Sequence, residues 1–444
     1  MSAASPLVPP KPRRRGLRAI ALGVALTAVA LPAAAESGDV AALRAMVEAQ
    51  AKELQALRAR LEAVETGVSG TQERVQIAEE QLDATATVVE RLGPTPAAGG
   101  DAWFASTTLA GYGELHYNNL DADSPNRDLK EADFHRFVVF LGHRFSDRLA
   151  MHSEIEIEHA LVADSAAGSN TGELELEQAF IDYRVDDAHV VRAGQFLLPF
   201  GILNETHEPP TFYGVERNDV ENVIIPGTWW EAGIGASGDY ANGLGWDLAV
   251  HSGLKIPVTG SNAFRVRSGR QKVANAAARD LAYSGRLRYR PMPGLDLSAS
   301  VQYQGDASQV ARDGLDEAWL YSLTGDLRLG GFGLRALWSE WKFEGDAVEA
   351  AGVDEQSGWY VEPSWRFGPG AMGDGLGDVG VYVRYSDVDG ARRFDRFEQW
   401  EFGLNYWPIE DVVLKADIRR REHDLATEQG RDFDGFDLSV GYQF

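Results

Sequence analysis

From about residue 107 to the C-terminus, apolar and polar residues alternate with a period of two. Leu287 and Tyr289, for example, alternate with Arg286, Arg288 and Arg290. Successive side chains of a β-strand point to opposite faces, so each such segment predicts a strand with one apolar and one charged face. The chain is therefore expected to be all-β over most of its length.

This alternation fits two classes of protein. A soluble sandwich buries its apolar face against a second sheet, whereas a membrane barrel turns that face to lipid and lines its lumen with polar residues. The expected strands have about 10–12 residues, against a usual 5–6 in soluble sheets. Aromatic residues gather at the expected strand ends, for example Trp229, Trp341 and Trp407, where a barrel places its aromatic girdles. These features favour an antiparallel transmembrane β-barrel.

The N-terminus has the three parts of a secretory signal peptide. A basic cluster at 11–18 precedes an uncharged apolar run at 19–31 and a small-residue cleavage site at 33–35. The apolar run is too short for a membrane-spanning helix, which needs about 20 residues. We expect residues 1–35 to be removed by cleavage after Ala35, with a twin-arginine signal as the alternative export route.

A heptad repeat follows the signal peptide. Every seventh residue from Val40 to Val89 is apolar, as are five of the eight companion positions from Leu43 to Leu92. A repeat held over eight heptads predicts an α-helical coiled coil at 36–92, because one seam must face a partner helix throughout. The alternative is a lone amphipathic helix. The Pro- and Gly-rich residues 93–106 read as a linker to a barrel domain at 107–444.

The C-terminal region yields sixteen expected strands, an even number as a single-chain bacterial barrel with both ends in the periplasm requires. Short turns such as 146–147 and 291–294 belong to the periplasmic rim, and longer stretches lie outside. A barrel of this size leaves an aqueous channel. The long stretches are 118–133, 160–172, 199–227, 254–280, 305–316, 344–356, 387–396 and 422–433.

Composition excludes several functions. Cysteine is absent, which excludes disulfides, zinc knuckles, iron–sulfur clusters and thiol catalysis. A net charge of −25 argues against a general nucleic-acid binder. The chain has no GxSxG, HExxH or phosphate-binding GxxxxGK[ST] motif. We expect no enzyme activity, no catalytic residues, no cofactor and no metal.

Two segments resemble a known family. The stretch Val191–Gly201 resembles the strand-then-Pro-Phe-Gly junction of the phosphate-selective porin O/P family. The closing segment Phe436–Phe444 is similar to the terminal strand by which the assembly machinery recognises Gram-negative outer-membrane proteins, with Phe444 as the assembly signal. The resemblance implies a homotrimer of sixteen-stranded barrels in the lipid bilayer of the outer membrane, some members having an N-terminal coiled coil, here expected in the periplasm.

The resemblance also implies a constriction loop at 199–227, between the fifth and sixth strands. An ordinary external loop is the alternative. Its charged residues are Glu205, Glu208, Glu216, Arg217, Asp219 and Glu221.

Charges of both signs are expected on the lumen faces of the strands. Opposed rows of these charges predict an electric field across the lumen. The alternative is that the charges pair with one another and only keep the lumen hydrated. Because acidic residues dominate the loop, the sequence favours a mildly cation-preferring or nearly unselective pore over a phosphate-selective one. The pore-lining basic residues are Arg136, Arg144, Arg286, Arg288, Arg290 and Arg384, and the acidic ones are Glu154, Glu156 and Glu158.

The expected function is therefore an outer-membrane porin that passes small hydrophilic solutes or ions by passive diffusion. The alternative is a structural anchor in which the coiled coil tethers the barrel to the cell wall or to a partner.

Overall fold

The structure is a computed structural model that describes residues 103–162, 172–310, 314–368 and 376–444. The predicted signal peptide with its cleavage site at Ala35, the coiled coil at 36–92 and residues 93–102 of the linker lie outside the described residues. Among the residues described, no helix has the length and apolar character needed to cross a membrane.

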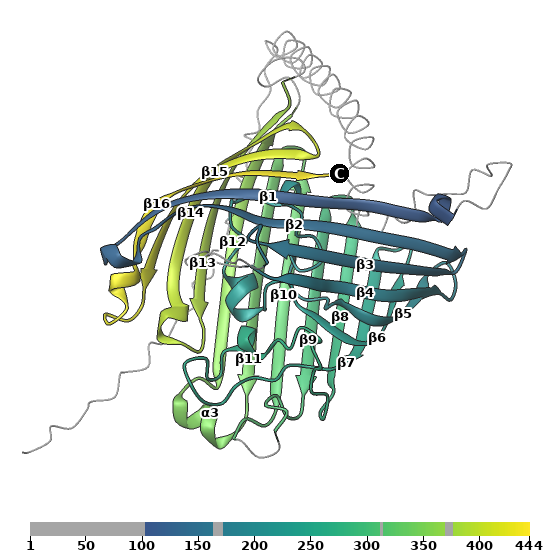
Figure 1. Ribbon diagram of the computed structural model, residues 1–444, viewed down its shortest axis with the longest axis horizontal. Coiled ribbons are helices and arrows are strands. Elements are labelled where there is room, and N and C mark those ends of the chain that lie inside the picture. Colours follow the sequence, from purple (N-terminus) through teal and green to yellow (C-terminus); the bar gives the residue numbers. More distant parts are fainter. Residues whose placement is uncertain (1–102, 163–171, 311–313, 369–375) are drawn as a thin grey trace, which may run out of the picture. The chain divides into compact units, whose positions relative to one another are not determined.

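The described chain forms a closed antiparallel barrel of sixteen strands, in which each strand pairs with its neighbours in sequence and β1 pairs with β16 (Figure 1). Each of the sixteen strands expected from the alternation corresponds to one of them. The strands are β1 Thr107–Ala122, β2 Leu129–Ser146, β3 Leu149–Glu158, β4 Leu174–Arg184, β5 His189–Leu197, β6 Trp230–Asp239, β7 Leu244–His251, β8 Ala282–Met292, β9 Leu295–Gln304, β10 Ala318–Leu329, β11 Phe332–Phe343, β12 Glu355–Phe367, β13 Asp378–Asp389, β14 Arg396–Ile409, β15 Val412–His423 and β16 Phe433–Gln443.

Short turns lie at one end of the barrel and most of the long connections at the other, as expected for the periplasmic and external rims of an outer-membrane barrel. In their described residues, the connections contain one short α-helix, α3 (Asp346–Ala351), and several single-turn helices. These are η1 Trp103–Ser106, η2 Pro125–Arg127, η3 Pro209–Thr211, η4 Val220–Ile224, η5 Val266–Gly269, η6 Arg393–Asp395 and η7 Gln429–Arg431.

The two faces of the wall have opposite chemistry. On β8, the outward Leu287 is 69% exposed, whereas its neighbour Arg286 is 9% exposed on the inner side. The same contrast holds on β3, where Ile155 is exposed and Glu154 and Glu156 are buried. Apolar side chains thus face outward and charged ones face the interior, which is the arrangement of a membrane barrel and the inverse of a soluble sandwich.

The first long connection is shorter than the sequence predicts. Residues 118–133 were expected as a loop, but β1 continues to Ala122 and β2 begins at Leu129. The polar residues that suggested a loop instead pair across the strands: Lys130 Nζ lies 2.5 Å from Asp121 Oδ1.

Aromatic residues at strand ends serve two different purposes. Trp359 and Trp400 are outward and partly exposed, as girdle residues should be. Trp229, Trp341 and Trp407 are buried, and the indoles of the last two donate to main-chain carbonyls at 2.9 and 3.2 Å. The sequence assignment of these three tryptophans to a girdle is wrong. Trp229 belongs to the connection between β5 and β6, which folds inward, and Trp341 and Trp407 pack against that connection.

The C-terminal residue completes the barrel. The main chain of Phe444 exchanges two hydrogen bonds with Gly111 of β1, at 2.8 and 2.9 Å. Its ring is 60% exposed on the outer surface and lies 6.3 Å, centroid to centroid, from Phe137 of β2. Phe444 therefore contributes both to closure and to the outward apolar stripe of β16.

We predict that deletion of Phe444 impairs assembly more than secretion, since it removes two closing hydrogen bonds and the end of that stripe. Heat-modifiable gel mobility of outer-membrane fractions should show a several-fold loss of folded barrel while processed protein still reaches the periplasm. Phe436→Ala, on the same face of β16, is the control for loss of one outward ring. Undiminished folded barrel after deletion of Phe444 would contradict the prediction.

Candidate functional site

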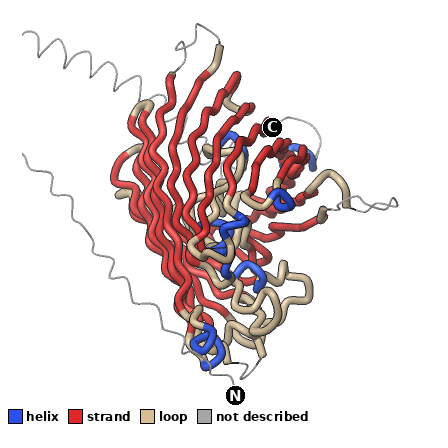
Figure 2. The backbone as a smooth tube through the Cα atoms, turned by 90° about the vertical axis from the view of Figure 1, so that its left-hand side faces the viewer, coloured by secondary structure: helices blue, strands red, loops and turns tan. Residues whose placement is uncertain are grey.

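The connection between β5 and β6 folds into the barrel, and we call residues 198–229 the inward loop. Figure 2 shows tan and blue connecting segments on the inner side of the red strands. It contacts opposite parts of the wall: His207 lies 3.2 Å from Glu154 of β3, and the carbonyl oxygen of Thr211 lies 3.0 Å from Arg335 of β11. The loop therefore crosses the interior.

Cationic side chains of the wall hold the main chain of the inward loop. Arg335 of β11 donates to the carbonyl of Thr211 at 3.0 Å. Arg384 of β13 and Lys415 of β15 donate to the carbonyls of Tyr213 and Gly214, each at 2.8 Å. Charge-assisted hydrogen bonds of this kind are among the stronger ones in proteins, so this part of the loop has a defined position.

Arg384 is itself held by two carboxylates. Its guanidinium lies 2.7 Å from Glu362 of β12 and 2.8 Å from Glu401 of β14, and all three side chains are buried. An arginine fixed on both sides is a rigid donor, and removal of either partner would leave a buried charge without compensation. The predicted pore-lining Arg384 is thus an anchor of the loop.

Glu221 organises the loop internally. Its Oε1 accepts hydrogen bonds from the backbone amides of Ile202 and Leu203. Its Oε2 accepts from Asn218 at 2.7 Å and from the Tyr360 hydroxyl of β12 at 3.1 Å. One buried carboxylate therefore joins the start of the loop, its helical turn η4 and the wall.

The remaining acidic residues of the loop also face protein groups. Glu205 pairs with Arg286 of β8, and Asp219 pairs with Arg421. Burial raises the pKa of Glu208. Burial also opposes ionisation of Glu216, but His116 and Arg419 outweigh it and hold the pKa of Glu216 well below its usual range.

An apolar cluster supports the loop on the side of β9–β14. Ile224 and Ile225 of the loop are buried there with Trp341 of β11 and Tyr360 of β12. A second connection, residues 252–281 between β7 and β8, adds Leu254, Ile256, Phe264 and Val266 to the same cluster. This side of the interior is therefore occupied by two packed loops.

The opposite side of the interior carries a row of carboxylates that we call the acidic wall. These side chains project inward from two adjacent strands, while Ile155, Leu174 and Leu176 between them face outward. The acidic wall consists of Glu154, Glu156 and Glu158 of β3 and Glu175 and Glu177 of β4.

Cationic groups from β2, the neighbour of β3, and from both loops contact the acidic wall. Arg136 lies 3.5 Å from Glu156, and Lys272 pairs with Glu175. Arg270 interacts electrostatically with carboxylates of both strands, and Arg217 does so with Glu156 and Glu177. The cationic groups of the two loops therefore face the acidic wall from the interior, while Arg136 flanks it on the adjacent strand.

Arg267, in the connection 252–281, has mainly cationic and neutral neighbours. Burial and the neighbouring guanidiniums of Arg270 and Arg265 lower the pKa of Arg267. Arg267 donates to Asn222, a neutral group of the inward loop. The loop cations are thus held in place partly by neutral acceptors, so their field is incompletely cancelled.

The other predicted basic residues are mostly paired. Arg286 lies 2.8 Å from Asp247, which also lies 3.1 Å from Arg288. Arg290 lies 2.7 Å from Asp296 near the short-turn end. Arg144 is half-buried near that end of β2. The structure brings Arg286 to the inward loop through Glu205, whereas Arg290 and Arg144 lie away from it.

Sequence reasoning missed Glu175 and Glu177 of the acidic wall. The alternation Glu173-Leu174-Glu175-Leu176-Glu177 mirrors Glu154-Ile155-Glu156-Ile157-Glu158 and could have revealed them. It also missed Arg267, Arg270 and Lys272. These three lie in a connection whose path no periodic pattern encodes.

Comparison with known proteins identifies the family. Residues 111–444 match the family described as phosphate-selective porin O and P. The chain belongs to this family. The porin also shares 35% identity over 216 residues with an uncharacterized protein of Aquifex aeolicus (strain VF5), an alignment covering 48% of each chain. The match thus spans about half the length of that relative.

Solved structures share the fold of the porin. The anion-selective porin from Comamonas acidovorans is 14% identical with a TM-score of 0.51, covering 76% of this chain and 99% of its own. Salmonella typhi OmpF in complex with daunomycin is 12% identical with a TM-score of 0.51, covering 76% and 97%. At these identities the likeness concerns the barrel fold.

We predict that Glu221→Ala loosens the inward loop, because it leaves the amides of Ile202 and Leu203 without their acceptor. Each buried donor left unpaired costs about 1–3 kcal/mol. Limited proteolysis of the detergent-solubilised porin should show new cleavage within 198–229, with the barrel still folded. Glu349→Ala on the exposed face of α3 is the matched control, and equal protection of both variants would contradict the role given to Glu221.

Proposed function

We propose that the porin forms a water-filled channel in the outer membrane for passive diffusion of small hydrophilic solutes or ions. The observation that carries the proposal is the inward loop, which is packed against β11–β15 and faces the acidic wall across the interior. A barrel that served only as an anchor would not need opposed charges at this position. Membership of a porin family also supports a channel, and nothing in the comparisons supports the alternative anchor role.

The channel is expected to pass along the acidic wall. Side chains on this side of the interior keep part of their surface accessible: Arg192 of β5 is 30% exposed and Asp182 of β4 is 21% exposed. The side toward β9–β14 is instead closed by the apolar cluster. Opposed rows of fixed charge in a narrow, low-dielectric passage orient polar solutes and enrich ions of the opposite sign.

We propose weak ion selectivity, set by the acidic wall more than by the carboxylates of the inward loop. Glu205, Glu216 and Asp219 are paired with side chains of the barrel wall, so their charges are largely compensated. Glu158 keeps part of its surface exposed on the acidic wall, whereas Glu156 is buried and opposed by the guanidinium groups of Arg136 and Arg217. The family description suggests phosphate selectivity. That selectivity would require the loop cations facing the acidic wall to outweigh its carboxylates.

The N-terminal region enters the proposal through its sequence. We propose that residues 1–35 direct export and are cleaved after Ala35. Residues 36–92 would then form a periplasmic coiled coil that joins the subunits of a homotrimer and contacts the cell wall. The outer-membrane assembly machinery is the proposed partner of Phe444. The mass of the mature protein in mild detergent tests the oligomer, and a monomer would contradict it.

Planar-bilayer recordings across a tenfold KCl gradient test the channel and its selectivity together. We expect single-channel conductance with a reversal potential near zero or slightly cation-preferring. Glu156→Gln combined with Glu158→Gln should move the reversal potential toward anion preference, because it removes negative charge beside the passage.

The matched control is the combination Glu205→Gln, Glu208→Gln and Glu216→Gln, which neutralises three loop carboxylates and should produce the smaller shift. Absence of conductance would contradict the channel. A larger shift from the loop variant would move the selectivity determinant from the acidic wall to the inward loop.

A further inference from the structure

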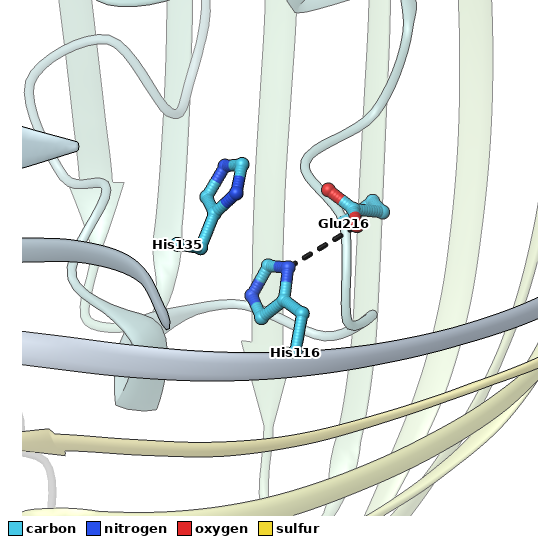
Figure 3. Close-up of side chains that lie close together, drawn as sticks. All are labelled: His116, His135 and Glu216. Carbon is cyan, nitrogen blue, oxygen red and sulfur yellow. Dashed lines mark hydrogen bonds and ion pairs between the residues drawn. The ribbon is translucent and has the colours of Figure 1, made fainter. Parts of the chain in front are cut away.

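Three imidazoles meet on the interior face where β1, β2 and β3 approach the long connections. The rings of His116 and His135 are stacked with centroids 4.6 Å apart, and His159 meets His135 edge-on at 5.5 Å. Figure 3 shows His116 and His135 beside Glu216 of the inward loop. The charged passage described above does not use this cluster.

The backbone brings these rings together through two irregularities. The register between β1 and β2 shifts between Glu114 and His116, so that His116 lies opposite Asp133. A β-bulge of this kind re-aims side chains and is common beside functional sites. After β3, His159 adopts a positive φ of 53° while its amide donates to the carbonyl of His135 at 3.1 Å.

Carboxylates surround the imidazoles. His116 Nδ1 lies 3.1 Å from Glu216 Oε1, and its Nε2 lies 3.2 Å from Glu114 Oε2. His135 Nδ1 lies 3.0 Å from Asp133 Oδ2. One potential ligand atom from each of His116, His135 and Glu216 lies within 4.8 Å of the others.

We infer that His116, His135 and Glu216 form a binding site for a divalent transition-metal ion of the Zn²⁺ class. Two imidazoles and a carboxylate, with no sulfur ligand, suit Zn²⁺, Ni²⁺ or Cu²⁺. With metal–ligand distances of about 2.0–2.2 Å, atoms sharing a tetrahedral ion stand about 3.4 Å apart. The 3.1 Å between His116 and Glu216 is already close to that separation, and the ligand atom of His135, within 4.8 Å of the other two, would complete the site by a small movement toward them.

Asp133 is a positioning residue for this site. Metal-bound histidines commonly engage a carboxylate through their second nitrogen, which fixes the ring and raises its basicity. Asp133 makes such a contact with His135 and a second one, at 2.8 Å, with His159. Asp133, His135 and His159 form an overlapping ligand set, but that set contains no residue of the inward loop.

A bound ion would join the inward loop to β1 and β2, because Glu216 belongs to the loop and both histidines belong to the wall. It would also add positive charge beside the channel. Cation conductance should therefore fall when the site is filled. This consequence rests on the proposed channel, whereas metal binding itself does not.

Calorimetric titration with Zn²⁺ tests the binding. The untagged mature porin, stripped with a chelator in detergent, should bind one saturable equivalent per chain. His116→Asn, His135→Asn and Glu216→Gln should each weaken binding about tenfold or more. His189→Asn, which alters a histidine paired with Asp186 at the short-turn end, is the control and should bind like the wild type.

Heat-modifiable gel mobility identifies variants that fail to fold. If a wall histidine proves essential for folding, Glu216→Gln still tests the site, because it changes only a loop side chain. In bilayers, micromolar Zn²⁺ should lower conductance reversibly in the wild type but not in Glu216→Gln.

Three results would overturn the inference. They are no saturable binding, undiminished affinity in the His116→Asn and Glu216→Gln variants, and loss of binding in His159→Asn without loss in His116→Asn. The last result would place the ion at the alternative ligand set of Asp133, His135 and His159. Binding without any channel current would refute the proposed function and leave the metal site standing.

Discussion

Hydrogen bonding of the backbone in hydrocarbon is the constraint on which the rest of this structure depends. A lipid-exposed amide or carbonyl without a partner costs several kcal/mol, so a sheet can cross a membrane only if it has no edge. Here β1 and β16 pair from Tyr112 and Gln443 to Ala122 and Phe433, and Phe444 extends the closure to Gly111. Closure dictates that one face of every strand meets lipid and the other faces an interior. That interior can hold charge because water and protein groups solvate it.

The inward loop resolves a second problem, which is how to place some thirty residues inside a barrel without leaving their polar groups unpaired. Carbonyl groups of the loop accept hydrogen bonds from Arg335, Arg384 and Lys415, and the carboxylate of Glu221 accepts from its amides. Apolar residues of both inward connections bury one another against β9–β14. One side of the inward loop is thus packed against the barrel wall, and its other side faces the carboxylates of the acidic wall.

The sequence predicted the strands well because period-two alternation is a local property of a membrane barrel, and all sixteen strands were identified from it. It placed Glu154, Glu156 and Glu158 on the inner face for the same reason. It did not predict that Trp341 and Trp407 face inward to hold the loop, since an indole that binds a carbonyl is indistinguishable in sequence from one at a membrane interface. Nor could it place His116 beside His135, because the β-bulge between Glu114 and His116 changes which residues share a face. The directions of Glu205, Glu216 and Asp219 depend on a loop path that no repeat encodes.

The central claim is that residues 198–229 lie across the barrel interior, fixed to the far wall. The chain has no cysteine, so a pair introduced as Asp219→Cys and Arg421→Cys would carry the only thiols. A short bifunctional thiol reagent should join these positions in the folded porin in detergent, because the wild-type side chains of Asp219 and Arg421 are in contact at 2.5 Å. The cross-linked peptide would be identified by mass spectrometry, with Asp219→Cys and Lys130→Cys as the control pair. Efficient linkage of 219 to 421 alone is the predicted result. Two reactive thiols that never cross-link would contradict the account and place the loop outside the barrel.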